Sequence, residues 1–162
     1  MRKQHLYHIV RLFAVLAVVA GGTAAAVPRV QAAASPVRVP AGVAWVNTGI
    51  IVAEDQEVCL DTHGVAITAP LVSFPAAISG PDGQVWNLGC GEYAGAPPPC
   101  ALEHAPYGAL VGRVGPFGSP FLIGGAPSFI PPASGALYLT VNDNLASYWD
   151  NLAGFTVLFG GK

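Results

Sequence analysis

The chain has 162 residues, of which 52% are hydrophobic and only 10% charged, and its formal net charge is −2. All nine acidic residues lie at or beyond Glu54, whereas only three of the seven basic residues follow residue 32, so the segment after that point carries 3 − 9 = −6. A domain with so few cations is excluded from binding nucleic acid through its phosphates. About 130 residues suffice for one domain with a hydrophobic core.

The first 32 residues have the features of a secretory signal. Met1-Arg2-Lys3 and Arg11 form a positive region, and the apolar run from Leu12 to Ala20 has the length of a signal core. Small residues follow, with A-x-A cleavage patterns ending at Ala26 and Ala32. The apolar run is too short for the ~20 residues that span a bilayer. We therefore expect cleavage near Ala32, export to the extracellular space and no stable membrane insertion of the product.

Residues 33–40 read as a flexible lead-in to a domain spanning 41–162. Gly and Pro interrupt the chain every few residues from Ala41 onward, and the short apolar runs between them are typical of strands. The predicted strands cover 44–52, 56–60, 64–69, 107–114, 120–124, 135–142 and 154–159. The region from Pro70 to Pro106 has no strand pattern, and a loop of that length is usually functional or poorly ordered.

Two of the predicted strands alternate clearly between apolar and other positions. Leu137, Leu139 and Val141 share one face of the first strand. Phe155 and its apolar partners two and four residues later share one face of the last strand. One apolar face per strand is what two packed sheets require. The sequence therefore predicts an all-β fold, a small antiparallel β-sandwich.

The three cysteines are Cys59, Cys90 and Cys100. In an oxidising compartment we expect a disulfide between Cys90 and Cys100, which bracket a loop rich in Gly and Pro. Cys59 is left over and is read either as a small buried residue or as part of a different pairing, which stays open.

The segment 142–151 concentrates polar side chains in a chain that is otherwise poor in them. It holds two carboxylates and three amides. Ca²⁺ takes six to eight oxygens from carboxylates, amides and carbonyls. We expect the segment to join neighbouring antiparallel strands, so that Asp143 at its start converges with Asp150 and Asn151 at its end. The alternative is a turn, in which Asn and Asp cap backbone groups. No EF-hand signature is present.

Nothing in the chain predicts an enzyme. No G-x-S-x-G, H-E-x-x-H or P-loop spacing occurs. Two carboxylates bound to one cation make a poor acid and base, because the metal holds both ionised. A secreted hydrolase is thus the least supported reading.

The chain resembles the calcium-dependent galactose-binding lectins of the PA-I type. The resemblance rests on Trp45–Ile50, Gly80–Gly83, Tyr107–Gly115 and Gly135–Asp143, followed by Asp150-Asn151 and Phe155. It implies a jelly-roll-like sandwich of the galactose-binding type that holds one Ca²⁺. Departures between Gly80 and Cys100 leave the family's middle-loop ligands unassigned.

The resemblance also implies site residues. Asp143, the backbone carbonyl of Ser147, Asp150 and Asn151 match the metal ligands, although the family has Asn where Asp150 stands. Asp143, Asn144 and Asp150 fall beside the sugar. A sugar face often rests on an aromatic ring, which Trp149 or Tyr148 would provide unless these rings pack in the core or anchor the loop.

The favoured hypothesis is therefore a secreted, non-catalytic domain that binds carbohydrate of the galactoside type through Ca²⁺, alone or as an oligomer. The alternative is a structural or adhesive extracellular domain in which Ca²⁺ stabilises the loop and no sugar binds.

Overall fold

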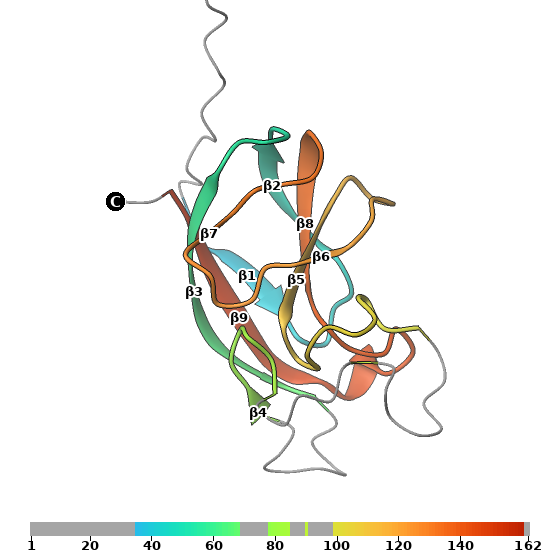
Figure 1. Ribbon diagram of the computed structural model, residues 1–162. Coiled ribbons are helices and arrows are strands. Elements are labelled where there is room, and N and C mark those ends of the chain that lie inside the picture. Colours follow the sequence, from blue (N-terminus) through green and yellow to red (C-terminus); the bar gives the residue numbers. More distant parts are fainter. Residues whose placement is uncertain (1–34, 69–77, 85–89, 91–98, 161–162) are drawn as a thin grey trace, which may run out of the picture.

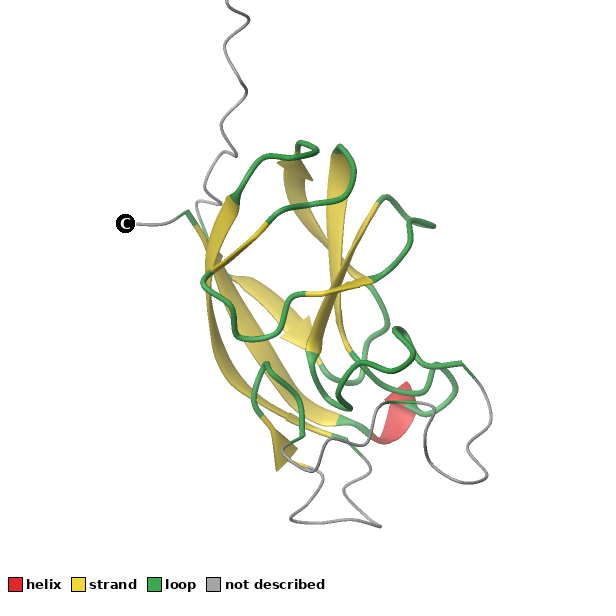
Figure 2. Ribbon diagram, in the orientation of Figure 1, coloured by secondary structure: helices red, strands yellow, loops and turns green. Residues whose placement is uncertain are grey.

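The computed structural model describes residues 35–68, 78–84, 90 and 99–160, so the expected signal peptide lies outside the described part. Two antiparallel sheets face each other (Figures 1 and 2). The first contains β1 (Val37–Pro40), β9 (Leu152–Phe159), β3 (Val58–Ile67) and β4 (Ile78–Ser79) in that order, with β7 (Ser128–Phe129) also paired to β3. The second has the order β2 (Val46–Val52), β8 (Gly135–Val141), β5 (Leu110–Val114) and β6 (Phe121–Leu122). The predicted all-β sandwich is confirmed.

The core lies between the two sheets and is built by the alternating strands. Leu137, Leu139 and Val141 of β8 are fully buried, and Phe155 and Val157 of β9 face them from the other sheet. Each such side chain contributes roughly 1.5–3 kcal/mol when it leaves water. The predicted apolar faces of β8 and β9 are therefore confirmed as the two walls of the core.

The N-terminal edge of the first sheet differs from the expectation. Within the expected flexible lead-in 33–40, residues Val37–Pro40 form β1 and pair with β9, and Val39 is fully buried. The prediction of a flexible segment is wrong there. The strand is short and ends in a proline, which an edge strand tolerates because one side of it needs no N–H donors.

The predicted strands 56–60 and 64–69 are one continuous strand, β3. Gly64, the first residue of the second predicted strand, lies within β3 opposite Phe155 of β9, with φ of +112°. A Cβ at this position would lie 2.5 Å from the carbonyl oxygen of Gly154. The glycine therefore permits close approach of two strands and makes no turn.

The remaining strands are shorter than predicted or were not predicted at all. β6 occupies two residues of the expected 120–124, and β4 and β7 are two-residue strands with no periodicity to detect. β5 begins at Leu110, and residues 107–109 before it contact the end of β8. Among the described residues, no helix is long and apolar enough to cross a membrane.

Candidate functional site

The polar segment 142–151 connects β8 to β9, which belong to different sheets. The expectation that it joins neighbouring antiparallel strands is wrong, because β8 pairs with β2 and β5 while β9 pairs with β1 and β3. The segment crosses from one sheet to the other at one end of the sandwich and contains the 3-10 turn η1 (Tyr148–Asp150) (Figure 2). Its side chains converge through the folding of the loop itself and through a second segment, residues 99–109.

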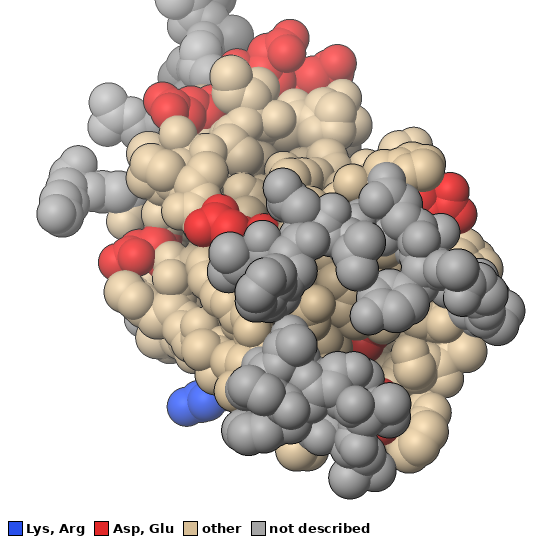
Figure 3. All heavy atoms as spheres, turned by 60° about the horizontal axis from the view of Figure 1, so that its bottom comes forward, with Lys and Arg blue, Asp and Glu red and all other residues tan. Residues whose placement is uncertain are grey.

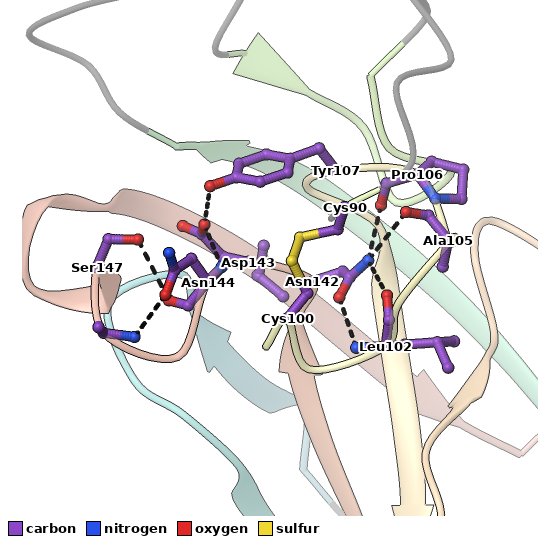
Figure 4. Close-up of a disulfide and its surroundings, with 12 residues drawn as sticks. Cys90, Cys100, Leu102, Ala105, Pro106, Tyr107, Asn142, Asp143, Asn144 and Ser147 are labelled. Carbon is purple, nitrogen blue, oxygen red and sulfur yellow. Dashed lines mark hydrogen bonds between the residues drawn. A yellow bond between two sulfur atoms is a disulfide. The ribbon is translucent and has the colours of Figure 1, made fainter. Parts of the chain in front are cut away.

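Asn142 fastens the loop to this second segment. It is fully buried, and its Oδ1 accepts a hydrogen bond from the backbone N of Leu102 at 2.9 Å. Its Nδ2 donates to the carbonyls of Leu102, Ala105 and Pro106 at 3.0–3.2 Å (Figure 4). One buried amide thereby satisfies the backbone hydrogen-bonding groups of a loop 36–40 residues earlier in the chain. These bonds also fix the orientation of the residues that flank Asn142.

A disulfide reinforces the same contact. Cys90 and Cys100 are bonded, as predicted, and both are buried. The backbone of Cys100 pairs with that of Asn144 in an isolated antiparallel β-bridge. The backbone N of Ala101 donates to the carbonyl of Asp143 at 3.1 Å. Cys59 is a free, exposed cysteine on β3, so the reading of a buried residue does not apply.

Asp143 is the centre of the site. The residue is 1% exposed, and its carboxylate receives three hydrogen bonds. Figure 4 shows two of the donor residues, Tyr107 and Asn144, beside it. Oδ1 accepts from the hydroxyl of Tyr107 and from the backbone N of Asn144, while Oδ2 accepts from Nδ2 of Asn151. Asn151 is held in turn by a bond from its Nδ2 to the carbonyl of Ala41 at 3.2 Å. The loop thus fixes a buried carboxylate against an amide from its far end.

Within the described part of the chain, no basic side chain pairs with the carboxylate of Asp143. Burial raises the pKa of this carboxyl, its hydrogen bonds lower it, and Asp150 adds a like charge that raises it. Among the described residues the one ion pair joins His63 and Asp61 on β3. Acidic side chains also predominate over basic ones in Figure 3, which turns this end of the molecule forward. A buried charge without a counter-ion is costly, and a cation would offset that cost.

Two further oxygens of the loop are buried and receive no hydrogen bond from the part of the chain that the structure describes. They are Oδ1 of Asp150 and Oδ1 of Asn151. Buried acceptors are normally satisfied, and each unsatisfied one costs about 1–3 kcal/mol. Carboxylate and amide oxygens left without donors are ligands suited to a hard cation. The oxygen types present here are thus those that Ca²⁺ binds in proteins.

The middle of the loop is folded on itself. Oδ1 of Asn144 accepts from the backbone N of Ala146 at 2.8 Å, and Ser147 donates to the Asn144 carbonyl through both its N and its Oγ. The carbonyl of Ser147 accepts one bond, from the N of Asp150 at 3.2 Å. A carbonyl has two lone pairs, so this oxygen retains the capacity to bind a cation.

The two aromatic residues of the loop differ in their surroundings. Tyr148 is buried, and its hydroxyl donates to the carbonyl of Val141 at 2.6 Å, so it anchors the loop. Trp149 is 79% exposed, which excludes core packing for its indole. Leu145 and Leu152 nearby in the sequence are also exposed. An exposed indole next to Asp150 is available to the apolar face of a ligand.

Sequence reasoning missed two residues of the site, Tyr107 and Asn142. Both lay in motifs that carried the resemblance, but neither was assigned a role. No periodic pattern could have connected Tyr107 with Asp143, since 36 residues separate them. Within the described parts of the chain, no group of three or more His, Cys, Asp or Glu side chains could hold a metal. A cation here would depend on amide and carbonyl oxygens as well.

Comparison with known proteins supports the fold. A search of solved structures finds similarity to a domain described as "EclA N-terminal domain; PllA-like lectin", with a TM-score of 0.54 and 22% identity. The match covers 76% of this chain and 92% of that one. No family model and no curated protein matches. The chain therefore has a lectin-like β-sandwich fold.

Proposed function

We propose that this chain is an exported, non-catalytic domain that binds carbohydrate through Ca²⁺ held by its 142–151 loop. The observation that carries the proposal is the buried carboxylate of Asp143, which has no basic partner among the described residues. It lies in one loop with two buried oxygens, those of Asp150 and Asn151, that receive no hydrogen bond from the same residues. These three side chains and the carbonyl of Ser147 are the cation ligands. The lectin-like fold supports the carbohydrate part of the proposal.

The chemistry follows from the weakness of sugar binding in water. A sugar hydroxyl exchanges bonds with water for bonds with protein and gains little. A bound Ca²⁺ supplies positive charge and open coordination positions that two adjacent hydroxyls fill together. Asp143 and Asp150 accept hydrogen bonds from these hydroxyls, and charge-assisted bonds of this kind are stronger than neutral ones. Asn144 lies beside them, and Trp149 provides a ring for the apolar face of the sugar.

Galactosides are the proposed ligand class because of the resemblance to PA-I type lectins, and the extracellular space is the proposed location because of the signal-like leader. Calcium is abundant there, so a site of modest affinity is filled.

Sequential calorimetry tests the proposal on the full mature chain. Protein stripped with EDTA is titrated with Ca²⁺, and then with methyl galactoside in Ca²⁺ and in EDTA. We expect heat from Ca²⁺, and heat from the sugar only when Ca²⁺ is present. Asp143→Asn should abolish both signals. Asp61→Asn, the same change on an exposed side chain of β3, should alter neither.

Two results would contradict the proposal in different ways. No heat from Ca²⁺ would refute the cation site. Heat from Ca²⁺ without heat from any galactoside, followed by no binding on a glycan array in Ca²⁺, would leave the structural or adhesive alternative.

A further inference from the structure

Tyr107 reaches the candidate site from outside the loop. It belongs to the 99–109 segment that precedes β5, whereas Asp143 follows the end of β8. The hydroxyl of Tyr107 donates to Oδ1 of Asp143 across the contact between these two segments (Figure 4). A phenol is protonated at neutral pH, so this hydroxyl is the donor and the Asp143 carboxylate is the acceptor.

The three donors on Asp143 are not equally replaceable. The N of Asn144 belongs to the adjacent peptide, and Nδ2 of Asn151 is also bound to the carbonyl of Ala41. The hydroxyl of Tyr107 is on the end of a half-buried side chain that reaches the loop from another segment, where it also interacts with the backbone of Asn144 and the side chain of Ser147. Of the three donors, it is the one whose own backbone lies outside the loop, so rotation of its side chain can remove it while the loop backbone stays in place.

The backbone around Tyr107 is fixed, which restricts any movement to the side chain. The carbonyl of Tyr107 accepts from the N of Gln84 at 2.8 Å, and the N of Gly108 donates to the carbonyl of Asn142 at 2.8 Å. Gly108 has φ of +77°, and a Cβ there would lie 2.1 Å from Oγ of Ser79, so the turn after Tyr107 is closely packed.

A phenol and an external ligand compete for the same oxygen. The hydroxyl directs the positive end of its O–H dipole at Oδ1 of Asp143, which is where a cation would bind and where a sugar hydroxyl would donate. We infer that the Tyr107 hydroxyl is an internal substitute for the ligand at Asp143, and that ligand binding displaces it by rotation of its side chain. This inference rests on the proposed function, and it makes Tyr107 a residue that weakens affinity.

Removing the hydroxyl tests the inference. Ca²⁺ affinities of the wild type, Tyr107→Phe and Tyr107→Leu are measured by competition with a chromogenic chelator. Because a hydrogen bond to a charged acceptor no longer has to be broken, we expect both variants to bind Ca²⁺ at least about tenfold more tightly. Tyr138→Phe is the matched control, since that hydroxyl lies on the second sheet and accepts a bond from exposed Asn47. Its affinity should stay within about twofold of wild type, as is usual for surface changes.

A second readout follows the phenol itself. In protein labelled with ¹³C at tyrosine Cζ, the resonance that disappears in Tyr107→Phe should move when Ca²⁺ is added to the wild type. The resonance assigned to Tyr138 should not move.

The outcomes separate this inference from the proposed function. Affinity in Tyr107→Phe and Tyr107→Leu that is equal to or weaker than wild type would overturn the inference and leave the calcium site standing. Binding by the variants but not by the wild type would support the inference and refute calcium dependence of the native chain. Folded proteins none of which binds Ca²⁺ would refute both.

Discussion

Asn142→Ala is the substitution expected to damage the candidate site most without touching its ligands. The side chain accepts one hydrogen bond from Leu102 and donates its two hydrogens among three carbonyls. At about 1 kcal/mol net for each of three bonds, the loss is about 3 kcal/mol. The residue is fully buried, so solvent does not replace the missing partners and this figure is not reduced by screening.

Urea denaturation in EDTA measures the effect, with the change taken from the midpoint at constant m. Asn47→Ala is the matched control, since that amide is exposed. The free energy of unfolding of this variant should differ from that of the wild type by less than about 0.5 kcal/mol. Because Asn142 aligns the 99–109 segment with the loop, Ca²⁺ affinity should also fall in Asn142→Ala. A loss below about 1 kcal/mol would refute the reasoning that this amide holds the two segments together.

Three other predictions concern charge, stacking and covalent constraint. Burial raises the pKa of Asp143 in the folded state above about 4, its pKa in unfolded chains. In EDTA the free energy of unfolding should therefore fall as pH rises from about 4 through the folded-state pKa. Asp143→Asn should abolish both this fall and the gain in Tm on adding Ca²⁺. The same dependence of stability on pH in wild type and variant, measured in EDTA, would contradict this prediction. Trp149→Ala should leave Tm unchanged, because the indole is exposed, but weaken galactoside binding; unchanged affinity in calorimetry would exclude the indole from the contact. Replacing Cys90 and Cys100 by Ala should lower the free energy of unfolding by about 3 kcal/mol, as expected for a disulfide that closes a loop of ten residues. Denaturant titrations of both proteins without reductant measure this loss, and a loss near zero would refute the contribution of the disulfide.

The architecture was largely predictable because its central strands have a local signal. Leu137 and Phe155 each begin an alternating run, and both runs form walls of the core. β1 was not predictable in the same way, since four residues ending in Pro40 become a strand only through pairing with β9. The role of Gly64 likewise depends on pairing with β9, because only the close approach of the Gly154 carbonyl requires a residue without a Cβ there.

The site was predictable only in its local part. Asp143, Asp150 and Asn151 are close in sequence, so composition and resemblance both drew attention to them. The contacts of Tyr107 and Asn142 join segments 36–40 residues apart, and no pattern within either segment specifies them. Residues 85–89 and 91–98, which fall in the region where the sequence departs from the lectins it resembles, lie outside the described residues.

The central claim is that the 142–151 loop holds a cation, and an anomalous difference map of crystals grown with Tb³⁺ in place of Ca²⁺ tests it most directly. We predict one strong peak within about 2.3–2.6 Å of side-chain oxygens of Asp143, Asp150 and Asn151. In the electron density of the same crystals the hydroxyl of Tyr107 should have left Oδ1 of Asp143. An anomalous map with no peak in this loop, together with electron density that shows Tyr107 still bound to Asp143, would contradict the account.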